Sequence, residues 1–339
     1  MLQLRYRAAS LPFKHPFTLS KGTKTHQETL VVSLGFAGRA AGLGEAPAIA
    51  YYNQTVGGMT EVLEKHKGSI ERYALQDPER FWHFLHHLIP GENFVTAALD
   101  TAAWDLFAQL RRQSLQNLLG TAGKPAPQTD FTIGIDTPEA MAEKVKEVPW
   151  PVYKVKVGSP ADIDNLRAIR AVTTAPLRLD ANEAWTYDET LRLLPELEKL
   201  GVVLLEQPLK RAEIEAQAAL KAQSNIPLFA DESCVGEKDV AACAAGFHGL
   251  NIKFAKCGGL TPARRMIAEA RTLGFQVMLG TMNECGIGTA ALAALAPLAD
   301  FLDADGPLLL AGDLVTGLEM VDHRWVLSEH TGLGLRWKG

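Results

Sequence analysis

Eight short apolar runs recur between residues 131 and 303, and stretches with helical spacing separate them. The runs are, in order, 131–135, 153–157, 177–180, 202–206, 228–231, 250–253, 276–280 and 301–303. Strands at a spacing of roughly 25 residues, with a helix in each gap, are typical of a parallel β/α barrel. An open doubly wound sheet is the alternative, but it spreads its strand ends along a line. Because polar residues close many of the runs, we favour the barrel, which brings its strand ends round one pocket.

The first 120 residues follow a different pattern. Residues 2–7 alternate like a strand, 29–34 form a β-branched run, and 59–119 have helical spacing. Residues 120–128 are rich in Gly and Pro and have no periodicity, which marks a domain boundary. We therefore predict an α+β capping domain over 1–120 and a barrel over 121–310. The remaining segment, 311–339, is expected to pack back on the capping domain.

Composition limits the class of protein. A chain of 339 residues that is 47% hydrophobic can bury a large core. A net charge of -5 with mixed signs gives no basic field, which excludes nucleic acid as a partner. The four cysteines show no CxxC spacing, which fits a reducing cytoplasm. The sequence has neither a signal peptide nor an apolar run of about 18 residues. We therefore expect a cytoplasmic protein without membrane association. The sequence does not fix the oligomeric state, although barrels of this size often form homo-oligomers.

Three carboxylates close three successive runs: Asp180, Glu206 and Asp231. Neighbouring strands lie about 5 Å apart, so these side chains can converge on one cation. Oxygen ligands alone favour a hard ion, and Mg2+ is the natural candidate. Each acid could instead cap the following helix. Three in succession at equivalent positions favour the metal site, because they would repel one another without a cation.

Lysines precede and follow these acids. Lys154 and Lys156 are two residues apart on the second run, so both point the same way, into the barrel. Lysines there are costly to bury without a function. Lys253 closes the sixth run and projects from the opposite side of the ring. A lysine on each side of a metal-bound substrate is what a two-base proton transfer requires.

Motifs at successive strand ends carry a family resemblance. They are Lys-x-Lys at 154–156, Asp-x-Asn at 180–182, Glu-Gln-Pro at 206–208, Asp-Glu-Ser at 231–233, Asn-Ile-Lys at 251–253 followed by Lys-Cys-Gly-Gly at 256–259, and the helix sequence at 98–106. Across about residues 12–315 the chain resembles the muconate-lactonising subgroup of the enolase superfamily. The resemblance implies a modified TIM barrel, (β/α)7β, with an N-terminal α+β capping domain.

The resemblance also implies roles for individual residues. Asp180, Glu206 and Asp231 match the Mg2+ ligands, and Lys156 and Lys253 match the acid/base pair, with Lys154 nearby. The superfamily uses a lysine base together with Mg2+ to hold an enediolate. The residues expected to support this site from behind are Asn182, Glu232 and Lys256.

Asp303 and Asp305 end the eighth run, and an Asp-x-Asp at this place resembles dipeptide epimerases. There the pair receives the free α-ammonium group of the substrate. Two carboxylates on one strand face form an anionic socket that favours a cation and repels an acyl carboxylate. An ordinary turn is the alternative. We therefore predict an isomerase that epimerises the C-terminal residue of a dipeptide, with L-Ala-D/L-Glu, a cell-wall peptide fragment, as one candidate.

Selectivity for side chains is expected in two lid segments, 18–24 and 48–53, and after the seventh run. Lys21 or Lys24 would pair with an acidic side chain, and Met282 and Asn283 would touch it. An N-acylamino-acid racemase or o-succinylbenzoate synthase would use the same lysines and metal but would need a neutral or basic receptor in place of the two aspartates. A catalytically silent barrel that acts as a binding protein is the alternative from another class.

Overall fold

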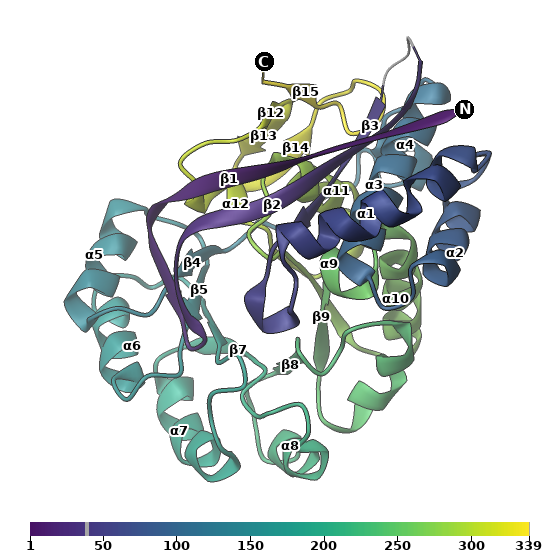
Figure 1. Cartoon of the computed structure of the whole chain (residues 1–339). Helices are drawn as coiled ribbons and strands as arrows, with labels where there is room; N and C mark the ends of the chain where they lie inside the picture. Colours follow the sequence, from purple (N-terminus) through teal and green to yellow (C-terminus); the bar gives the residue numbers. More distant parts are fainter. Residues whose placement is uncertain (38–40, 339) are drawn as a thin grey trace.

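The computed structural model describes residues 1–37 and 41–338, and its N-terminal part is a three-stranded antiparallel sheet with helices packed against it (Figure 1). The elements are β1 (Leu2–Leu19), β2 (Gly22–Phe36), β3 (Ala41–Pro47), η1 (Ala50–Tyr52), α1 (Val56–Arg72), α2 (Pro78–Leu88), α3 (Asn93–Leu110) and α4 (Leu115–Leu119). Side chains such as Leu4, Val32 and Leu63 are buried between the sheet and the helices. This part is the α+β unit that the alternating and helical patterns predicted.

The hairpin of β1 and β2 is long, and it carries a bulge. Pairing runs regularly to Pro12, opposite His26, and resumes at Phe17, opposite Lys24. Residues 13–16 therefore stand against a single residue of β2, which bends β1. The bent arm runs from the N-terminal sheet across the barrel, so that its tip lies over the strands of the second domain (Figure 1).

The second part is a parallel eight-stranded barrel in the order β4 to β11. Its strands are β4 (Phe131–Ile133), β5 (Tyr153–Lys156), β6 (Leu177–Asp180), β7 (Val202–Glu206), β8 (Leu228–Ala230), β9 (Gly249–Lys253), β10 (Gln276–Gly280) and β11 (Phe301–Asp303). In the part of the chain that the structure describes, one isolated bridge, between Thr129 just before β4 and Leu302 of β11, links the two ends of this sheet. The predicted modified TIM barrel is confirmed.

Helices surround the barrel, but not after every strand. They are α5 (Pro138–Glu147), α6 (Asp162–Arg170), α7 (Tyr187–Lys199), α8 (Ile214–Lys221), α9 (Phe254–Cys257), α10 (Leu260–Thr272), α11 (Gly286–Leu295) and α12 (Gly306–Leu309), with 3-10 turns η2 (Glu237–Asp239), η3 (Ala241–Ala245) and η4 (Ala296–Leu298). The turns η2 and η3 replace a helix after β8. After β11 the four residues of α12 cover little of the barrel, and the arm of β1 lies there instead (Figure 1).

The barrel interior is layered. Outward-facing residues such as Val155 and Leu179 pack against the helices, while Leu204, Phe229 and Met278 form an apolar layer of their own. Gly249 makes room for this layer, because a Cβ atom there would lie 2.3 Å from the Phe229 ring. Along the strands, charged residues follow this layer toward the carboxyl ends, where barrel enzymes place their chemistry.

Helix α3 connects the two parts and the C-terminal segment. Asp105 accepts hydrogen bonds from the amide of Leu43 at 2.8 Å and from the amide of Leu333 at 2.8 Å. The C-terminal segment forms two small hairpin-like sheets from β12 (Val315–Thr316), β13 (Leu318–Val321), β14 (Arg324–Leu327) and β15 (Arg336–Trp337). In the two described ranges, no helix combines the length and the apolar character that crossing a membrane requires.

Candidate active site

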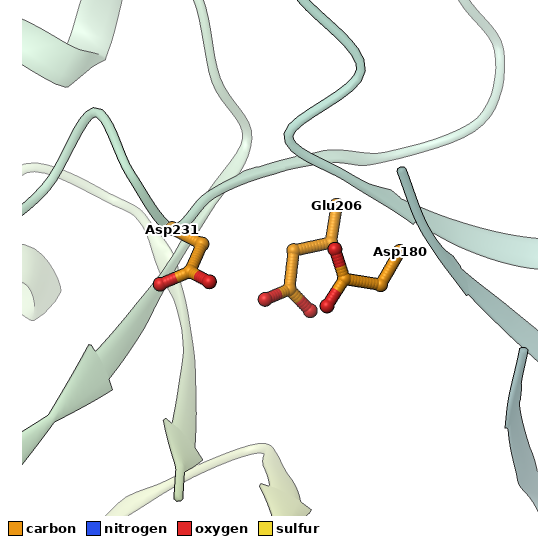
Figure 2. A group of neighbouring side chains, drawn as sticks. All are labelled: Asp180, Glu206 and Asp231. Carbon is orange, nitrogen blue, oxygen red and sulfur yellow. The ribbon is translucent and has the colours of Figure 1, made fainter. Parts of the chain in front are cut away.

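Three carboxylates meet at the carboxyl ends of neighbouring strands. The strand register places Asp180 of β6 beside Glu206 of β7, and Asp231 follows directly after β8. All three are buried, and one oxygen of each lies within 4.8 Å of the others. Figure 2 shows the three side chains pointing toward one another. The three acids, which are about 25 residues apart in the sequence, thus form one cluster in the structure.

The cluster fits a hard divalent cation. Its donors are carboxylate oxygens, which Mg2+ prefers. Oε1 of Glu206 accepts a hydrogen bond from Asn251 at 2.8 Å, and the buried Oε2 lies 2.8 Å from the ammonium nitrogen of Lys154. Three buried carboxylates this close repel one another, and a bound divalent cation would remove that repulsion.

The two predicted acid/base lysines stand at opposite ends of the cluster. Lys156 Nζ on β5 lies 2.6 Å from Oδ2 of Asp180. Lys253 Nζ on β9 lies 2.8 Å from Oδ2 of Asp231. Both lysines are less than a tenth exposed, and both line the same cavity of about 30 Å³. A substrate carbon held between them would therefore meet an amine from either side.

Lys154 lies deeper and joins the cluster to β11. Its Nζ is 3.0 Å from Asp180 Oδ2, 2.8 Å from Glu206 Oε2 and 2.6 Å from Asp303 Oδ2. Burial alone would lower the pKa of Lys154, but the surrounding carboxylates outweigh it and raise that pKa well above its ordinary value. Lys154 is therefore a fixed cation in this arrangement.

Burial and the lysines act against each other on the carboxylates. Burial acts to raise the pKa of Asp180, but Lys154 and Lys156 outweigh it and hold that pKa below the usual range. At Glu206, burial and then the Asp180 charge raise the pKa to about 7. Of Asp180 and Glu206, Asp180 is thus the one whose negative charge the lysines stabilise more strongly.

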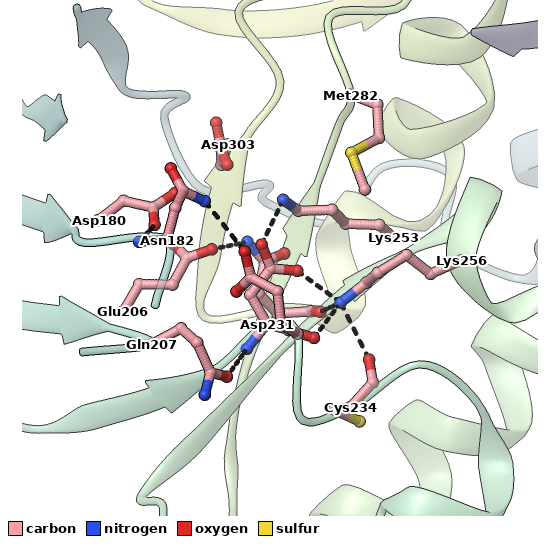
Figure 3. A network of polar contacts seen from close by, with 12 residues as sticks. Asp180, Asn182, Glu206, Gln207, Asp231, Cys234, Lys253, Lys256, Met282 and Asp303 are labelled. Carbon is pink, nitrogen blue, oxygen red and sulfur yellow. Dashed lines mark hydrogen bonds and ion pairs between the residues drawn. The ribbon is translucent and has the colours of Figure 1, made fainter. Parts of the chain in front are cut away.

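The predicted supporting residues hold the cluster from behind. Lys256 Nζ donates to Oδ1 of Asp231 at 2.5 Å and to the Cys234 carbonyl at 2.9 Å (Figure 3). Asn182 accepts from Lys156 at 3.2 Å and donates to Glu232 Oε1 at 3.2 Å. These contacts fix the orientation of the Asp231 carboxylate and of the Lys156 amine.

Two residues that hold the carboxylate cluster in place were not predicted. Asn251 binds Glu206, as described above, and Gln207 Oε1 accepts from the amides of Asp231 and Ser233 at 3.1 and 3.0 Å. A signal for Asn251 was present, because strand alternation places it on the same face as Lys253. Gln207 has φ 36, a backbone conformation that the sequence pattern does not reveal.

The two aspartates of β11 have different surroundings. Asp303 lines the cavity and contacts Lys154. Asp305 lies behind it, where Oδ2 accepts from the amide of Thr132 at 2.6 Å. Burial, and then the Asp303 charge, raise the pKa of Asp305 to about 6. The pair is therefore close enough to interact, with Asp303 facing the cavity.

The lid residues divide between the cavity and its outside. Lys24, Met282 and Asn283 line the cavity. Burial, and then the charge of Lys156, lower the pKa of Lys24 to about 8. Lys21 instead forms an ion pair of 2.9 Å with Glu183, in the loop after β6.

The tip of the β1–β2 hairpin is thus tied to the barrel. The Lys21–Glu183 pair joins the hairpin to the loop after β6, and Lys21 Nζ also lies 5.3 Å from the centre of the Tyr51 ring. The Tyr51 hydroxyl donates to the Met282 sulfur at 3.6 Å. These contacts hold the hairpin tip and Tyr51 beside the cavity.

Family models match both parts of the chain. The N-terminal domain of the mandelate racemase/muconate lactonizing enzyme family matches residues 2–120, and the enolase C-terminal domain-like family matches residues 136–339. The chain belongs to the enolase superfamily. The resemblance drawn from its strand-end motifs is thereby confirmed.

Individual relatives within the superfamily are epimerases that act on dipeptides. The L-Ala-D/L-amino acid epimerase of Flavobacterium johnsoniae is 41% identical, over 98% of this chain and 99% of its own length. The L-Ala-D/L-Glu epimerase of Bacteroides thetaiotaomicron is 33% identical, over 98% and 88%. The dipeptide epimerase of Enterococcus faecalis V583, solved with Mg and L-Leu-L-Tyr, superposes with a TM-score of 0.92 at 30% identity and covers 98% of both chains.

Proposed function

We propose that this protein is an Mg2+-dependent dipeptide epimerase, an isomerase that inverts the α-carbon of the C-terminal residue of its substrate. The observation that carries the proposal is the placement of Lys156 and Lys253 at opposite ends of one carboxylate cluster, in one cavity. The relatives named above support the reaction, because they are epimerases of dipeptides or of L-Ala-amino acid pairs.

Asp180, Glu206 and Asp231 would hold the metal ion. When bound, Mg2+ supplies the positive charge that stabilises the substrate carboxylate as negative charge develops on it. The residues behind the cluster keep the carboxylates in place, with Lys256 on Asp231 and Asn251 on Glu206.

The two lysines move the proton. One of them starts as a neutral amine and removes the α-proton, and the other starts as an ammonium and donates a proton to the opposite face. Because each lysine serves one stereoisomer, the pair interconverts the L and D forms. Tyr51 and Met282, which contact each other at the cavity wall, would limit the access of water to the reacting carbon.

The β11 aspartates would bind the amino end of the substrate. Asp303 faces the cavity, and its carboxylate attracts a free α-ammonium group. An N-succinyl or other acyl carboxylate would be repelled there, which argues against the N-acylamino-acid racemase and o-succinylbenzoate synthase alternatives. Lys24 lies in the same cavity and would favour an acidic side chain on the C-terminal residue, as in L-Ala-D/L-Glu.

We place the reaction in the metabolism of cell-wall peptides, which contain dipeptide units with D residues, and in a reducing cytoplasm. The four cysteines are free and buried, which agrees with that compartment.

The test replaces each lysine and follows deuterium uptake at the α-carbon by mass spectrometry. Lys156→Ala and Lys253→Ala should each lower epimerisation by at least about 10³-fold, since both proton carriers are needed. At least one variant should still exchange the α-proton of a single stereoisomer. Lys199→Ala, at an exposed lysine of α7, is the matched control and should leave turnover unchanged. Full turnover by both cavity variants would contradict the assignment.

A further inference from the structure

A second pocket adjoins the catalytic cavity. It has a volume of about 180 Å³, compared with about 30 Å³ for the cavity that contains Lys156 and Lys253. Phe17 and Thr132 line both spaces, so they form the wall between them. The catalytic cavity by itself has room for about two water molecules, and a dipeptide needs more space than that.

Two features of the fold create this pocket. The barrel is joined between β4 and β11 by the single Thr129–Leu302 bridge, and α12 is too short to cover that seam. The bulge of β1 lies over it, beside α12 and β4 (Figure 1). Lys14 Nζ donates to the Leu308 carbonyl at 2.7 Å and so fastens the bulge to α12. Bulges next to active sites commonly redirect side chains in this way.

The lining of the pocket is apolar. Phe13 and Phe17 stack at 5.4 Å between ring centres, and Phe131, Trp150 and Leu309 complete the walls. Among the polar lining residues, Lys14, His15 and Glu147 are exposed, and the half-buried Lys144 pairs with Asp136 at 3.4 Å. Such a lining suits a hydrocarbon side chain and would penalise the burial of a charge.

The pocket lies next to the residues that would bind the amino end of a dipeptide. Thr132, in the shared wall, donates its amide to Asp305, and Asp303 faces the catalytic cavity. An α-ammonium group held at Asp303 would leave the side chain on the same carbon close to Phe17 and Thr132. We propose that this pocket, as part of the proposed epimerase site, receives an apolar side chain larger than a methyl group on the amino-terminal residue of the substrate. For that side chain to enter, the buried Phe17, which stacks on Phe13, has to change its position.

The test compares L-Leu-L-Xaa with L-Ala-L-Xaa, where Xaa is Glu, Leu or Lys, by α-deuterium uptake in the wild type and in two variants that fill the pocket. Leu309→Trp fills it from α12, and Val148→Phe fills it from the end of α5. Val326→Trp, on the exposed face of β14, is the matched control.

The wild type should turn over the Leu dipeptides with kcat/KM at least equal to that for the Ala dipeptides. Each filling variant should lower the Leu-to-Ala ratio by about 50-fold, the discrimination that three additional buried carbons provide. The control should leave the ratio unchanged. Turnover of the Ala dipeptides shows that a variant is folded, and the second variant serves if the first one unfolds.

Two results would overturn the proposal. One is an unchanged ratio in both filling variants, and the other is a wild type that prefers the Ala dipeptides tenfold or more. Either result leaves the epimerase function intact. Absence of α-proton exchange with every dipeptide would instead refute the proposed function, and the pocket assignment with it.

Discussion

Gly280 controls the position of a residue that holds the metal cluster, and its replacement by alanine gives a sharp prediction. Gly280 ends β10 and pairs with Lys253. A Cβ atom there would lie 2.3 Å from Oδ1 of Asn251, so the amide would have to retreat by about 1 Å to reach ordinary contact. That amide donates to Glu206 at 2.8 Å. The substitution therefore acts on Glu206 through Asn251.

The Gly280→Ala substitution is expected to lower both the stability of the fold and the affinity for Mg2+. Overpacking of the barrel costs about 1–3 kcal/mol of the free energy of unfolding. Loss of the hydrogen bond to Glu206 weakens one ligand of the cluster, and such losses lower metal affinity by about 10- to 100-fold. We therefore expect Gly280→Ala to raise the Kd for Mg2+ by that factor, measured by titration calorimetry. Urea unfolding without metal should report the stability loss separately.

Two controls isolate the mechanism. Gly312→Ala, where a Cβ atom would meet nothing within 4 Å, should change neither the Mg2+ affinity nor the stability by more than about 0.5 kcal/mol. Asn251→Ala removes the hydrogen bond without overpacking and should reproduce the loss of affinity. If both Gly280→Ala and Asn251→Ala bind Mg2+ as tightly as the wild type, the reasoning from Asn251 to the metal cluster is refuted.

Three further predictions concern the lid and the core. Lys24→Met should lower kcat/KM for dipeptides ending in Glu by about 10- to 100-fold relative to those ending in Leu, because a half-buried cation in the cavity is lost; equal effects on both series in steady-state assays would contradict the role of Lys24. Lys21→Met and Glu183→Gln should each raise KM by no more than about fivefold, and the double variant no further, because a partly exposed ion pair contributes at most about 1 kcal/mol. Additive effects would show that the two residues act separately. Burial raises the pKa of Asp100 from 3.8 to about 7, so the folded protein retains a proton that the unfolded chain releases. The free energy of unfolding should therefore fall as pH rises from 4 to 7, by at most about 4 kcal/mol from this group, and urea titrations should show a shallower fall for Asp100→Asn; an identical slope in that variant would rule out Asp100 as the source.

The barrel and its charged strand ends could be predicted because they depend on local patterns. The run 202–206 coincides with β7, since an apolar sequence that ends in a carboxylate is both a strand and a strand terminus. Asp180 and Glu206 could be brought together because parallel neighbours share a register, which the structure has. The metal cluster therefore follows from alternation and from spacing along the chain.

The residues that the sequence did not place depend on contacts between distant segments. Lys21 and Lys24 are three residues apart on one hairpin, yet Lys24 enters the cavity and Lys21 pairs with Glu183. The different positions of the two lysines depend on the bend of β1, where four residues lie opposite one residue of β2. No periodicity in the sequence predicts that bend. Asp105 likewise contacts backbone amides from both ends of the chain, and its position on a helix gives no sign of either partner.

The hydrogen bonds of Asp105 also bear on how the protein is made. A ribosome releases β3, with Leu43, long before it releases Leu333, and Asp105 needs the amides of both to be fully paired. The contacts of Asp105 are thus complete only after residue 333 has been synthesised, long after the three-stranded sheet. A nascent chain arrested before residue 333 would carry a buried carboxylate without one of its partners, so this link is completed only after the whole barrel has been synthesised.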